Sequence, residues 1–382
     1  MALVINSKLP QSGISVFARM TAAANQHEAI NLAQGFPNFS PPSALFEFLS
    51  EAVHKGMNQY AAMPGLPELR RQLSLRIERD YHAEWNPETE ITVTAGATQA
   101  LYTLISAFIR PGDKALVFEP AYDSYAPAIE VNGGIPVYLR LSLPDFSIPW
   151  DALERTLKTE RIKLILINNP HNPSGRILQR EDLERLERLT RDLDTLLVWD
   201  EVYDKLVFDG KQHASALHYP GLMERSIVVF SLGKTLHNTG WKVGYTLARP
   251  AITAEIRKLH QFTVFSVNTP AQYAICRFME TAPDFFNDLP DFYQQKRDFF
   301  FNHMQGTRFA FLPCEGSYFA LASYASLYDG GDSDFAMKLA AENRVAVIPI
   351  SAFYHDGFDP GMVRFCFAKT EDTIREAARR LA

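Results

Sequence analysis

Cysteine is scarce in this chain and forms no paired motif. The 382 residues include three cysteines, Cys276, Cys314 and Cys366, which are far apart in the sequence and form no CxxC pair. An odd number of widely spaced thiols is typical of reduced cysteines in a cytoplasmic protein, and it disfavours a disulfide framework and a metal site. We therefore expect a cytoplasmic protein that binds no metal.

Long apolar runs and an excess of basic charge are also absent. No uninterrupted apolar stretch approaches the ~20 residues that a membrane span needs, and the amino terminus lacks the basic and long apolar segments of a secretory signal. With 38 basic and 44 acidic residues, the formal net charge of −6 offers no broad positive field for nucleic acid or an anionic membrane. We expect neither partner, so any anion site must be local.

What the chain does contain is an alternation of short apolar runs and amphipathic stretches. Helices are expected at 99–109 and 182–192, where apolar residues recur at three- and four-residue spacing. Strands are expected at 91–94, 115–118, 136–139, 164–167, 196–199, 227–230 and 243–247. This alternation predicts an α/β fold with a doubly wound, mostly parallel seven-stranded sheet.

The pattern changes in the last third of the chain. After residue 250 it becomes one of long amphipathic helices, including 289–303, followed by short strands around Tyr318, Val347 and Phe365. Prolines interrupt the chain before residue 43, so the first segment is expected to pack away from the large sheet. We predict an amino-terminal segment (1–42) that joins a small carboxyl-terminal α+β domain (283–382), and a large domain (43–282).

Lys234 lies just after the apolar run 227–230, in the segment Ser231-Leu232-Gly233-Lys234-Thr235. Open α/β sheets bind ligands beyond the carboxyl ends of their strands. A lysine partly removed from water there, beside other cations, can attack an aldehyde as a neutral amine. A nucleotide P-loop also contains Gly-Lys-Thr, but Val228 stands where its first glycine should be. A solvated surface lysine is the ordinary alternative.

A candidate anion site follows the first expected strand. Residues 91–94 run into Ala95-Gly96-Ala97-Thr98 and then a helix, so the backbone N–H groups of Gly96, Ala97 and Thr98 and the Thr98 hydroxyl can face a phosphate. Ser231 can add a hydroxyl and Lys242 a positive charge. The alternatives are an ordinary helix start, a strand-end hydroxyl and a solvated cation.

Four further side chains follow strands expected at the same edge. Asp200 can keep a pyridine nitrogen protonated. Glu201 is the competing carboxylate, but neighbouring side chains of a strand point to opposite faces, so only one of the two should face the ring, and we choose Asp200. Tyr203 and Asn172 can both hydrogen-bond a phenolate oxygen, while Tyr122 can stack on a ring. A buried ion pair, a half-buried tyrosine, a rigid turn and a core aromatic are the respective alternatives.

In combination these segments resemble a known family. The segments GATQALY, EPAYDSY, NNPHNPSG, WDEVYD, SLGKT and TGWKVGY, in this order and spacing, are similar to those of fold type I pyridoxal phosphate enzymes, specifically class I aminotransferases. The resemblance covers nearly the whole chain, and QGFPNF and VRFCFAK extend it toward the methionine, glutamine and kynurenine aminotransferase branch. Lys242 stands where many relatives have arginine, so a point charge replaces a bidentate contact.

The resemblance implies a fold type I transferase that moves an α-amino group from an amino acid to a 2-oxo acid by ping-pong chemistry. Pyridoxal 5'-phosphate would form an aldimine with Lys234, which would later act as the general base. Arg364 would grip the substrate α-carboxylate in two parallel hydrogen bonds, or is merely an edge-strand charge. Gly35 would let the backbone approach that carboxylate, and Asn172 would contact substrate as well as cofactor.

The resemblance also implies a homodimer with composite sites. Tyr60, in Asn58-Gln59-Tyr60, would reach the cofactor phosphate of the neighbouring subunit. Core packing is the alternative for an isolated tyrosine.

Substrate choice depends on fewer residues. The segment 261–265 contains no arginine to bind a second carboxylate, which disfavours aspartate. An apolar, aromatic wall would suit methionine, aromatic amino acids, kynurenine or the stem of glutamine. The candidate wall residues, which could equally belong to the core, are Ile14, Phe17, Tyr102 and Phe265.

Two other functions are open at this stage. A cysteine-conjugate C–S β-lyase would use the same fold and cofactor, and the motifs barely separate it from an aminotransferase. A catalytically silent pyridoxal phosphate-binding regulator is a different class, although no additional DNA-binding domain or basic face is visible. Nicotinamide binding is disfavoured because Gly96-Ala97-Thr98-Gln99 lacks the GxGxxG spacing.

Overall fold

The computed structural model describes residue 3, residues 5–10 and residues 12–382. Its centre is a seven-stranded sheet in the order β2 (Ile91–Thr94), β8 (Gly244–Ala248), β7 (Ser226–Ser231), β6 (Leu196–Asp200), β5 (Ile162–Asn168), β3 (Lys114–Glu119) and β4 (Ile135–Arg140). Only β8 runs antiparallel to its neighbours. The predicted mostly parallel sheet is confirmed, and each predicted strand lies within two residues of an observed one.

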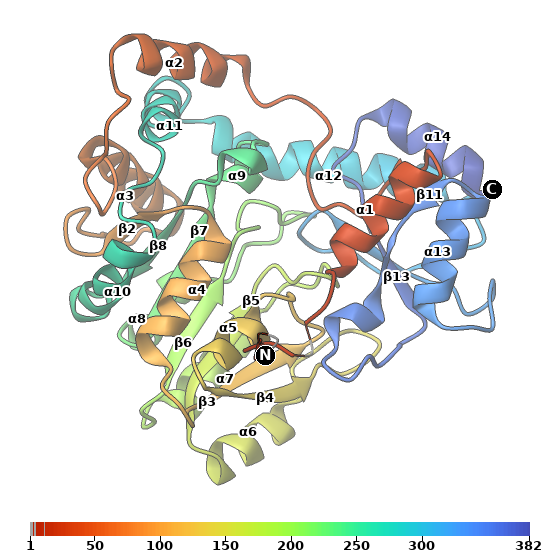
Figure 1. Cartoon of the computed structure of the whole chain (residues 1–382), viewed down its shortest axis with the longest axis horizontal. Coiled ribbons are helices and arrows are strands. Elements are labelled where there is room, and N and C mark those ends of the chain that lie inside the picture. The colour runs from red at the N-terminus through yellow and green to blue at the C-terminus, as the bar shows by residue number, and fades with distance from the viewer. Residues whose placement is uncertain (1–2, 4, 11) are drawn as a thin grey trace.

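Helices cover both faces of this sheet (Figure 1). Strand side chains alternate between the two cores: in β7, Ile227 and Val229 pack on one side, and Val228 and Phe230 on the other. This explains why the strands are continuous apolar runs. One side is covered by α4 (Ala97–Phe108), α5 (Tyr125–Val131) and α10 (Pro250–Thr263), and the other by α3 (Pro67–Tyr81), α6 (Trp150–Thr159), α7 (Arg180–Thr190) and α8 (Pro220–Met223).

A second, antiparallel sheet lies to the right of the first in Figure 1. Its order is β12 (Ile348–Pro349), β13 (Met362–Cys366), β10 (Phe319–Ser323) and β9 (Ala310–Phe311), and its helices are α12 (Phe285–Met304), α13 (Asp332–Glu342) and α14 (Glu371–Leu381). The helix predicted at 289–303 lies within α12. Tyr318 stands just before β10, and Val347 stands between β11 (Val345–Ala346) and β12. The prediction of three strands here was too few, because strands of two residues carry almost no periodic signal.

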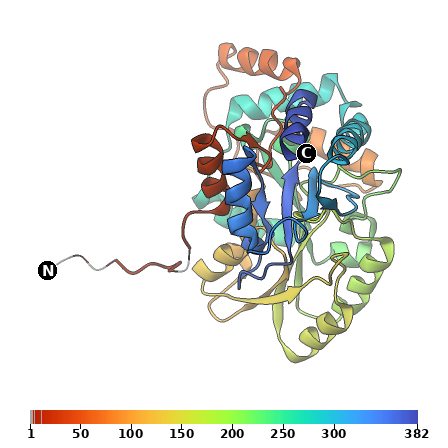
Figure 2. The same ribbon diagram turned by 90° about the vertical axis from the view of Figure 1, so that its right-hand side faces the viewer.

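The amino-terminal segment lies against this second region. Figure 2 shows α1 (Val16–Gln26) beside α13, and β1 (Ile30–Asn31) pairs in parallel with β11. Farther along, α2 (Ser43–His54) packs on α11 (Thr269–Thr281). The boundaries at residues 42 and 282 stay a prediction. The short helices are α9 (Leu232–Thr235), η1 (Ala216–His218), η2 (Thr239–Trp241) and η3 (Ile350–Phe353).

The two regions meet at the carboxyl edge of the large sheet. Beyond β3, the backbone N–H of Ala121 donates to the carbonyl of Phe353 at 2.8 Å. Beyond β7, the Lys234 side chain contacts Tyr318. In the part of the chain that the structure describes, no helix is both long enough and apolar enough to cross a membrane.

Candidate active site

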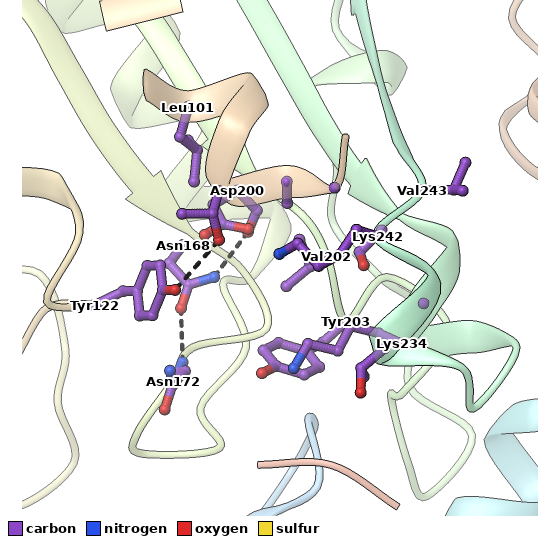
Figure 3. Close-up of a pocket in the computed structure, with 16 residues that line it drawn as sticks. Leu101, Tyr122, Asn168, Asn172, Asp200, Val202, Tyr203, Lys234, Lys242 and Val243 are labelled. Atoms are coloured by element: carbon purple, nitrogen blue, oxygen red, sulfur yellow. Dashed lines mark hydrogen bonds between the residues drawn. The ribbon is translucent and has the colours of Figure 1, made fainter. Parts of the chain in front are cut away.

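A cavity of about 180 Å³ lies at this edge, beyond β5, β6 and β7 and beside the start of α4 (Figure 3). Residues from segments far apart in the sequence converge on it, because parallel strands present their carboxyl ends on one side of a sheet. Its lining includes all the predicted cofactor residues except Tyr60, namely Gly96, Ala97, Thr98, Tyr122, Asn172, Asp200, Tyr203, Ser231, Lys234 and Lys242.

Lys234 stands on α9, the single helical turn that directly follows β7. Its Nζ donates to the hydroxyl of Tyr318 at 2.8 Å and to the carbonyl oxygen of Gly35 at 3.0 Å. Removal from water lowers the pKa of the Lys234 amine to about 8, and the nearby Arg364 and Lys242 charges act in the same direction. The amine is therefore closer to its neutral, nucleophilic form than an exposed lysine is.

Asp200 is the last residue of β6 and Glu201 follows it, and their carboxylates have different hydrogen-bond partners. Asp200 Oδ2 accepts a hydrogen bond from the Tyr125 hydroxyl at 2.5 Å, while its Oδ1 is buried without a partner. Glu201 faces away from the cavity and accepts from Ser215, and lies 2.9 Å from His213 Nε2. Burial raises the pKa of Asp200 to about 6. The cavity thus contains a carboxylate oxygen that a protonated ring nitrogen can satisfy.

The amino terminus of α4 forms one wall. Gly96 has a φ of +78°, which favours glycine, and a Cβ there would lie only 3.2 Å from Lys242 Nζ. The absence of a side chain leaves room for the lysine cation beside the first N–H groups of the helix. Ser231, the last residue of β7, lines the same part of the cavity. Backbone N–H groups, a hydroxyl and a cation together form a site suited to a phosphate.

The remaining wall is held together by side-chain hydrogen bonds that Figure 3 shows. Asn168 Nδ2 donates to the backbone carbonyl of Asp200 at 2.8 Å, and Asn168 Oδ1 accepts from the N–H of Asn172 at 2.7 Å. The hydroxyls of Thr98 and Tyr122 are 3.3 Å apart. These bonds fix the turn after β5 and the loop after β3 at the cavity.

Arg364, on β13, is not among the residues that line the cavity, and it contacts the lining residue Asn172. Its Nη1 donates to Asn172 Oδ1 at 2.7 Å and its Nη2 to the carbonyl of Ala33 at 2.9 Å, while Nε is buried without a partner. The guanidinium lies 3.8 Å from the centre of the Phe319 ring. Burial lowers the pKa of Arg364 to about 10, so the side chain is still a cation at neutral pH.

The predicted wall residues and Tyr60 do not line the cavity of this single chain. Phe17 comes nearest, with its ring centre 5.5 Å from the Arg364 guanidinium carbon. Ile14, Tyr102 and Phe265 are exposed, and so is Tyr60, which packs edge-on against Phe265 at 5.1 Å. The structure therefore places four of these five side chains, all except Phe17, at the surface of the single chain and not in the cavity or the core.

Among the residues that sequence reasoning missed, three have side chains that hydrogen-bond predicted site residues. Asn168 is the first residue of the NNPHNPSG turn, and Tyr125 ends the EPAYDSY segment, so each lay within a motif already singled out. Tyr318 had no such signal, because it belongs to the second region and meets Lys234 only through the tertiary fold.

Comparison with known proteins decides the family. Residues 27–381 match the model of aminotransferase class I and II. The chain belongs to this family. It is 46% identical to methionine aminotransferase of Escherichia coli, covering 99% of this chain and 98% of that protein. It is 33% identical to kynurenine–oxoglutarate transaminase of Dictyostelium discoideum, covering 96% and 93%.

Solved structures agree with this placement. A crystal structure of an Escherichia coli protein with a methionine aminotransferase function has a TM-score of 0.96 at 46% identity, covering 100% of this chain and 99% of that chain. A Thermus thermophilus aspartate aminotransferase structure has a TM-score of 0.89 at 27% identity, covering 99% of each. The predictions of a fold type I transferase and of an amino-acid aminotransferase are confirmed.

Proposed function

We propose that this aminotransferase holds pyridoxal phosphate in the cavity through Lys234. The family implies dependence on this cofactor. The observation that carries the proposal is the buried, unpartnered Asp200 Oδ1 in the cavity that also contains the Lys234 amine and the phosphate-type site at α4. When bound, pyridoxal phosphate supplies an aldehyde that combines with amines and a protonated ring that withdraws electrons.

The residues of the cavity divide by the part of the cofactor that they fit. Asp200 fits the ring nitrogen, because an anionic Oδ1 favours a protonated nitrogen. The face of the ring fits against Tyr122, and the phenolate oxygen against Asn172 and Tyr203. The phosphate fits the start of α4 together with Ser231 and Lys242.

Lys234 then serves as the base that would take the proton from the substrate Cα and deliver it to the carbon that belonged to the cofactor's aldehyde group. With a pKa of about 8, the freed amine is partly neutral at neutral pH and can both take up and release a proton. Arg364 binds the α-carboxylate, and its unpartnered Nε supplies a donor beyond those already used. Holding the carboxylate fixes the direction of the Cα–H bond.

Reduction with borohydride tests this assignment directly. We expect the reduced protein, after proteolysis and peptide mapping, to contain the cofactor on Lys234. A label on any other lysine would overturn the proposal.

We further propose that methionine and aromatic amino acids are the preferred donors, with glutamine and kynurenine also accepted. The support is the activity by which the relatives are named and the absence of an arginine in 261–265. Measurement of kcat/KM across these donors and aspartate tests it. If aspartate greatly exceeds methionine, the specificity proposal is wrong.

We also propose a homodimer in which Tyr60 completes the partner's phosphate site. Tyr60 is 79% exposed and lines a surface hollow with the segment Ser266–Pro270, so it is free to contact another molecule. Each of the variants Lys234→Ala and Tyr60→Ala impairs every site of its own homodimer. A mixed dimer has one intact site, so mixing should restore roughly a quarter of the normal activity. Mixed dimers with no gain would exclude a composite site.

A cytoplasmic location belongs to the same set of proposals. It is supported by the three cysteines, which are buried and unpaired in the structure. Cell fractionation tests it, and a protein recovered outside the cytoplasm would contradict it.

A further inference from the structure

Lys234 Nζ, the Tyr318 hydroxyl and the Gly35 carbonyl oxygen form a closed triangle. Nζ lies 2.8 Å from Tyr318 Oη and 3.0 Å from Gly35 O, and Tyr318 Oη lies 2.5 Å from Gly35 O. Lys234 comes from the large sheet, whereas Tyr318 immediately precedes β10 and Gly35 follows β1. The amine is therefore held by two groups outside the strand and helix that carry it.

The hydrogens of this triangle can be assigned. A phenol has one hydrogen, and the backbone carbonyl of Gly35 can only accept, so the Tyr318 hydroxyl donates to Gly35. Toward Lys234 the hydroxyl therefore offers only a lone pair. A neutral amine has two N–H bonds and one lone pair. The Tyr318 oxygen and the Gly35 carbonyl oxygen each accept one of these N–H hydrogens. The lone pair is then the only part of the nitrogen that is left to face another group.

We propose that Tyr318 is a positioning residue that, together with the Gly35 carbonyl, orients the lone pair of the Lys234 amine into the cavity. This inference rests on the proposed function of Lys234 as the base. A base can take up a proton only along its lone pair, so fixing that direction places the acceptor where the substrate Cα–H bond is presented.

The two acceptors are rigidly held. Tyr318 is fully buried, and its ring packs edge-on against Tyr203 at 5.1 Å. A Cβ on Gly35 would lie 2.8 Å from the Phe319 ring, so only glycine allows this backbone approach. The buried Lys369 donates to the neighbouring carbonyl of Phe36 at 2.8 Å. Burial raises the pKa of the Tyr318 phenol well above its usual value, so it keeps its hydrogen.

The triangle also affects the protonation of Lys234. Acceptors that hydrogen-bond an ammonium favour the charged form, so loss of the Tyr318 oxygen lowers the pKa of the amine below its value of about 8. Other groups that face the amine are Arg364 and Cys366 from β13, Asp200 from β6, Lys242, and Tyr203, whose ring centre lies 5.6 Å from Nζ. The change of Tyr318 to phenylalanine removes none of these side chains, so we expect a shift to report the lost oxygen.

The test measures the amine itself in the cofactor-free protein. Lys234 is labelled competitively with acetic anhydride across a pH series, and its labelling is quantified by peptide mapping. In Tyr318→Phe we expect the midpoint to move down by roughly one pH unit. The midpoint does not depend on access of the reagent, which changes only the plateau. An unchanged midpoint would overturn the proposal.

Tyr293→Phe is the matched control. Tyr293 is fully buried, its ring lies 5.9 Å from that of Tyr318, and its hydroxyl has no hydrogen-bond partner. The substitution removes a buried hydroxyl next to the triangle without touching Lys234. We expect the Lys234 midpoint and kcat of this variant to match those of the unmodified protein. If the labelling midpoint of Lys234 shifts equally in Tyr318→Phe and Tyr293→Phe, the shift reflects general packing and the proposal is wrong.

Catalysis gives a second readout. In Tyr318→Phe, kcat should fall roughly tenfold while KM changes little, because orientation of the base matters only in the proton transfer. If Tyr318→Phe does not fold, 3-fluorotyrosine at position 318 retains shape and hydroxyl but weakens the oxygen as an acceptor. It should lower the midpoint by a smaller amount, and no change would again contradict the proposal.

The experiments distinguish a failure of the proposed function of Lys234 from a failure of the proposed role of Tyr318. If borohydride places the cofactor on another lysine, both ideas fall. If the cofactor is on Lys234 and Tyr318→Phe behaves as Tyr293→Phe does, only the role of Tyr318 falls.

Discussion

Two groups of buried polar residues flank the large sheet, and they differ in whether all of their polar atoms have hydrogen-bond partners. One lines the cavity at its carboxyl edge. The other, the Arg76 cluster, consists of Arg76, Asp80, Tyr81, Asp204 and Tyr245. In the cluster every nitrogen of the Arg76 guanidinium has a partner: Nε lies 3.2 Å from Asp80, Nη1 donates to Tyr245 at 2.9 Å, and Nη2 contacts Asp204.

The polar residues at the cavity are not fully paired in this way. Asp200 Oδ1, in the cavity, and Arg364 Nε, on a side chain that contacts the lining residue Asn172, are both buried without partners. A buried, unpaired polar atom destabilises a fold, whereas a fully paired group does not carry that penalty. Under the proposed function, the unpaired Asp200 oxygen is left for a group of the cofactor, whereas the paired side chains of the Arg76 cluster stabilise the fold. Substitutions at the cavity should change activity, and those in the Arg76 cluster should change stability.

The largest expected effect is that of Lys234→Ala. Transamination should fall by at least roughly 10⁴-fold, because both the attachment point and the base are lost. Unfolding in urea should change little, since Lys234 contributes to the site and not to the core. Steady-state kinetics and circular dichroism measure the two quantities. Substantial remaining transamination would show that another group acts as the base.

Arg76→Met should have the largest effect on stability. The change leaves Asp204 and Asp80 with fewer partners in a buried setting, and about 3–5 kcal/mol of unfolding free energy should be lost. The activity of the molecules that remain folded should be nearly unchanged. Arg71→Met, an exposed position on the same helix, is the control and should stay within about 0.5 kcal/mol of the parent protein. Equal losses of unfolding free energy in the two variants would show that the buried Arg76 contributes no more to stability than an exposed arginine does.

Asp200→Asn should lower activity by roughly 100-fold, because a neutral amide no longer favours a protonated ring nitrogen. Its stability should change with pH in a defined direction. Burial raises the pKa of Asp200 from 3.8 to about 6. The folded state therefore binds more protons than the unfolded state between these values, and ionisation destabilises it as pH rises.

The substitution removes this destabilisation. Cofactor-free Asp200→Asn should therefore be at least as stable as the parent above pH 6, and its relative advantage should disappear as pH falls toward 3.8. Urea titrations of both proteins at several pH values measure the difference. A variant that is less stable above pH 6 would show that Asp200 serves the fold as Arg76 does.

Tyr81→Phe should give the smallest effect. It removes the hydrogen bond from the Tyr81 hydroxyl to Asp204 Oδ2 at 3.0 Å, so about 1–2 kcal/mol of stability should be lost with kcat unchanged. Tyr122→Phe is the matched change in the cavity. It removes only the 3.3 Å contact with Thr98 and should leave stability nearly unchanged. If urea unfolding shows a larger loss of stability for Tyr122→Phe than for Tyr81→Phe, the assignment of the cavity to function and of the Arg76 cluster to stability is wrong.

The fold was largely predictable because its signal is local. Each strand of the large sheet is a short apolar run, since helices cover both faces, and such runs stand out between amphipathic helices. Strand alternation predicted that only one of Asp200 and Glu201 faces the site, and the structure shows the two side chains with different partners. Strand β9 of the second sheet escaped prediction because its two residues are too few to show a period.

The candidate site was predictable mainly where its residues follow strands of the large sheet, whereas Arg364 and Gly35 of the second region were predicted only through the resemblance to a known family. Tyr318 approaches Lys234 only because the second region folds back onto the sheet edge. The side-chain wall had the weakest basis: Ile14 and Tyr102 are apolar enough for a pocket, but in the single chain they lie at the surface. Apolar character alone does not distinguish a pocket wall from an exposed face.

Runs of a few residues were enough to indicate a mostly parallel α/β protein and to predict a lysine, a helix start and a carboxylate at one edge of its sheet. Which buried polar atoms are left unpaired, and that Tyr318 and Gly35 contact the lysine amine, depends on the tertiary structure. Such contacts join segments separated by up to 283 positions. Their geometry is set by the packing of the two regions, which no local pattern encodes.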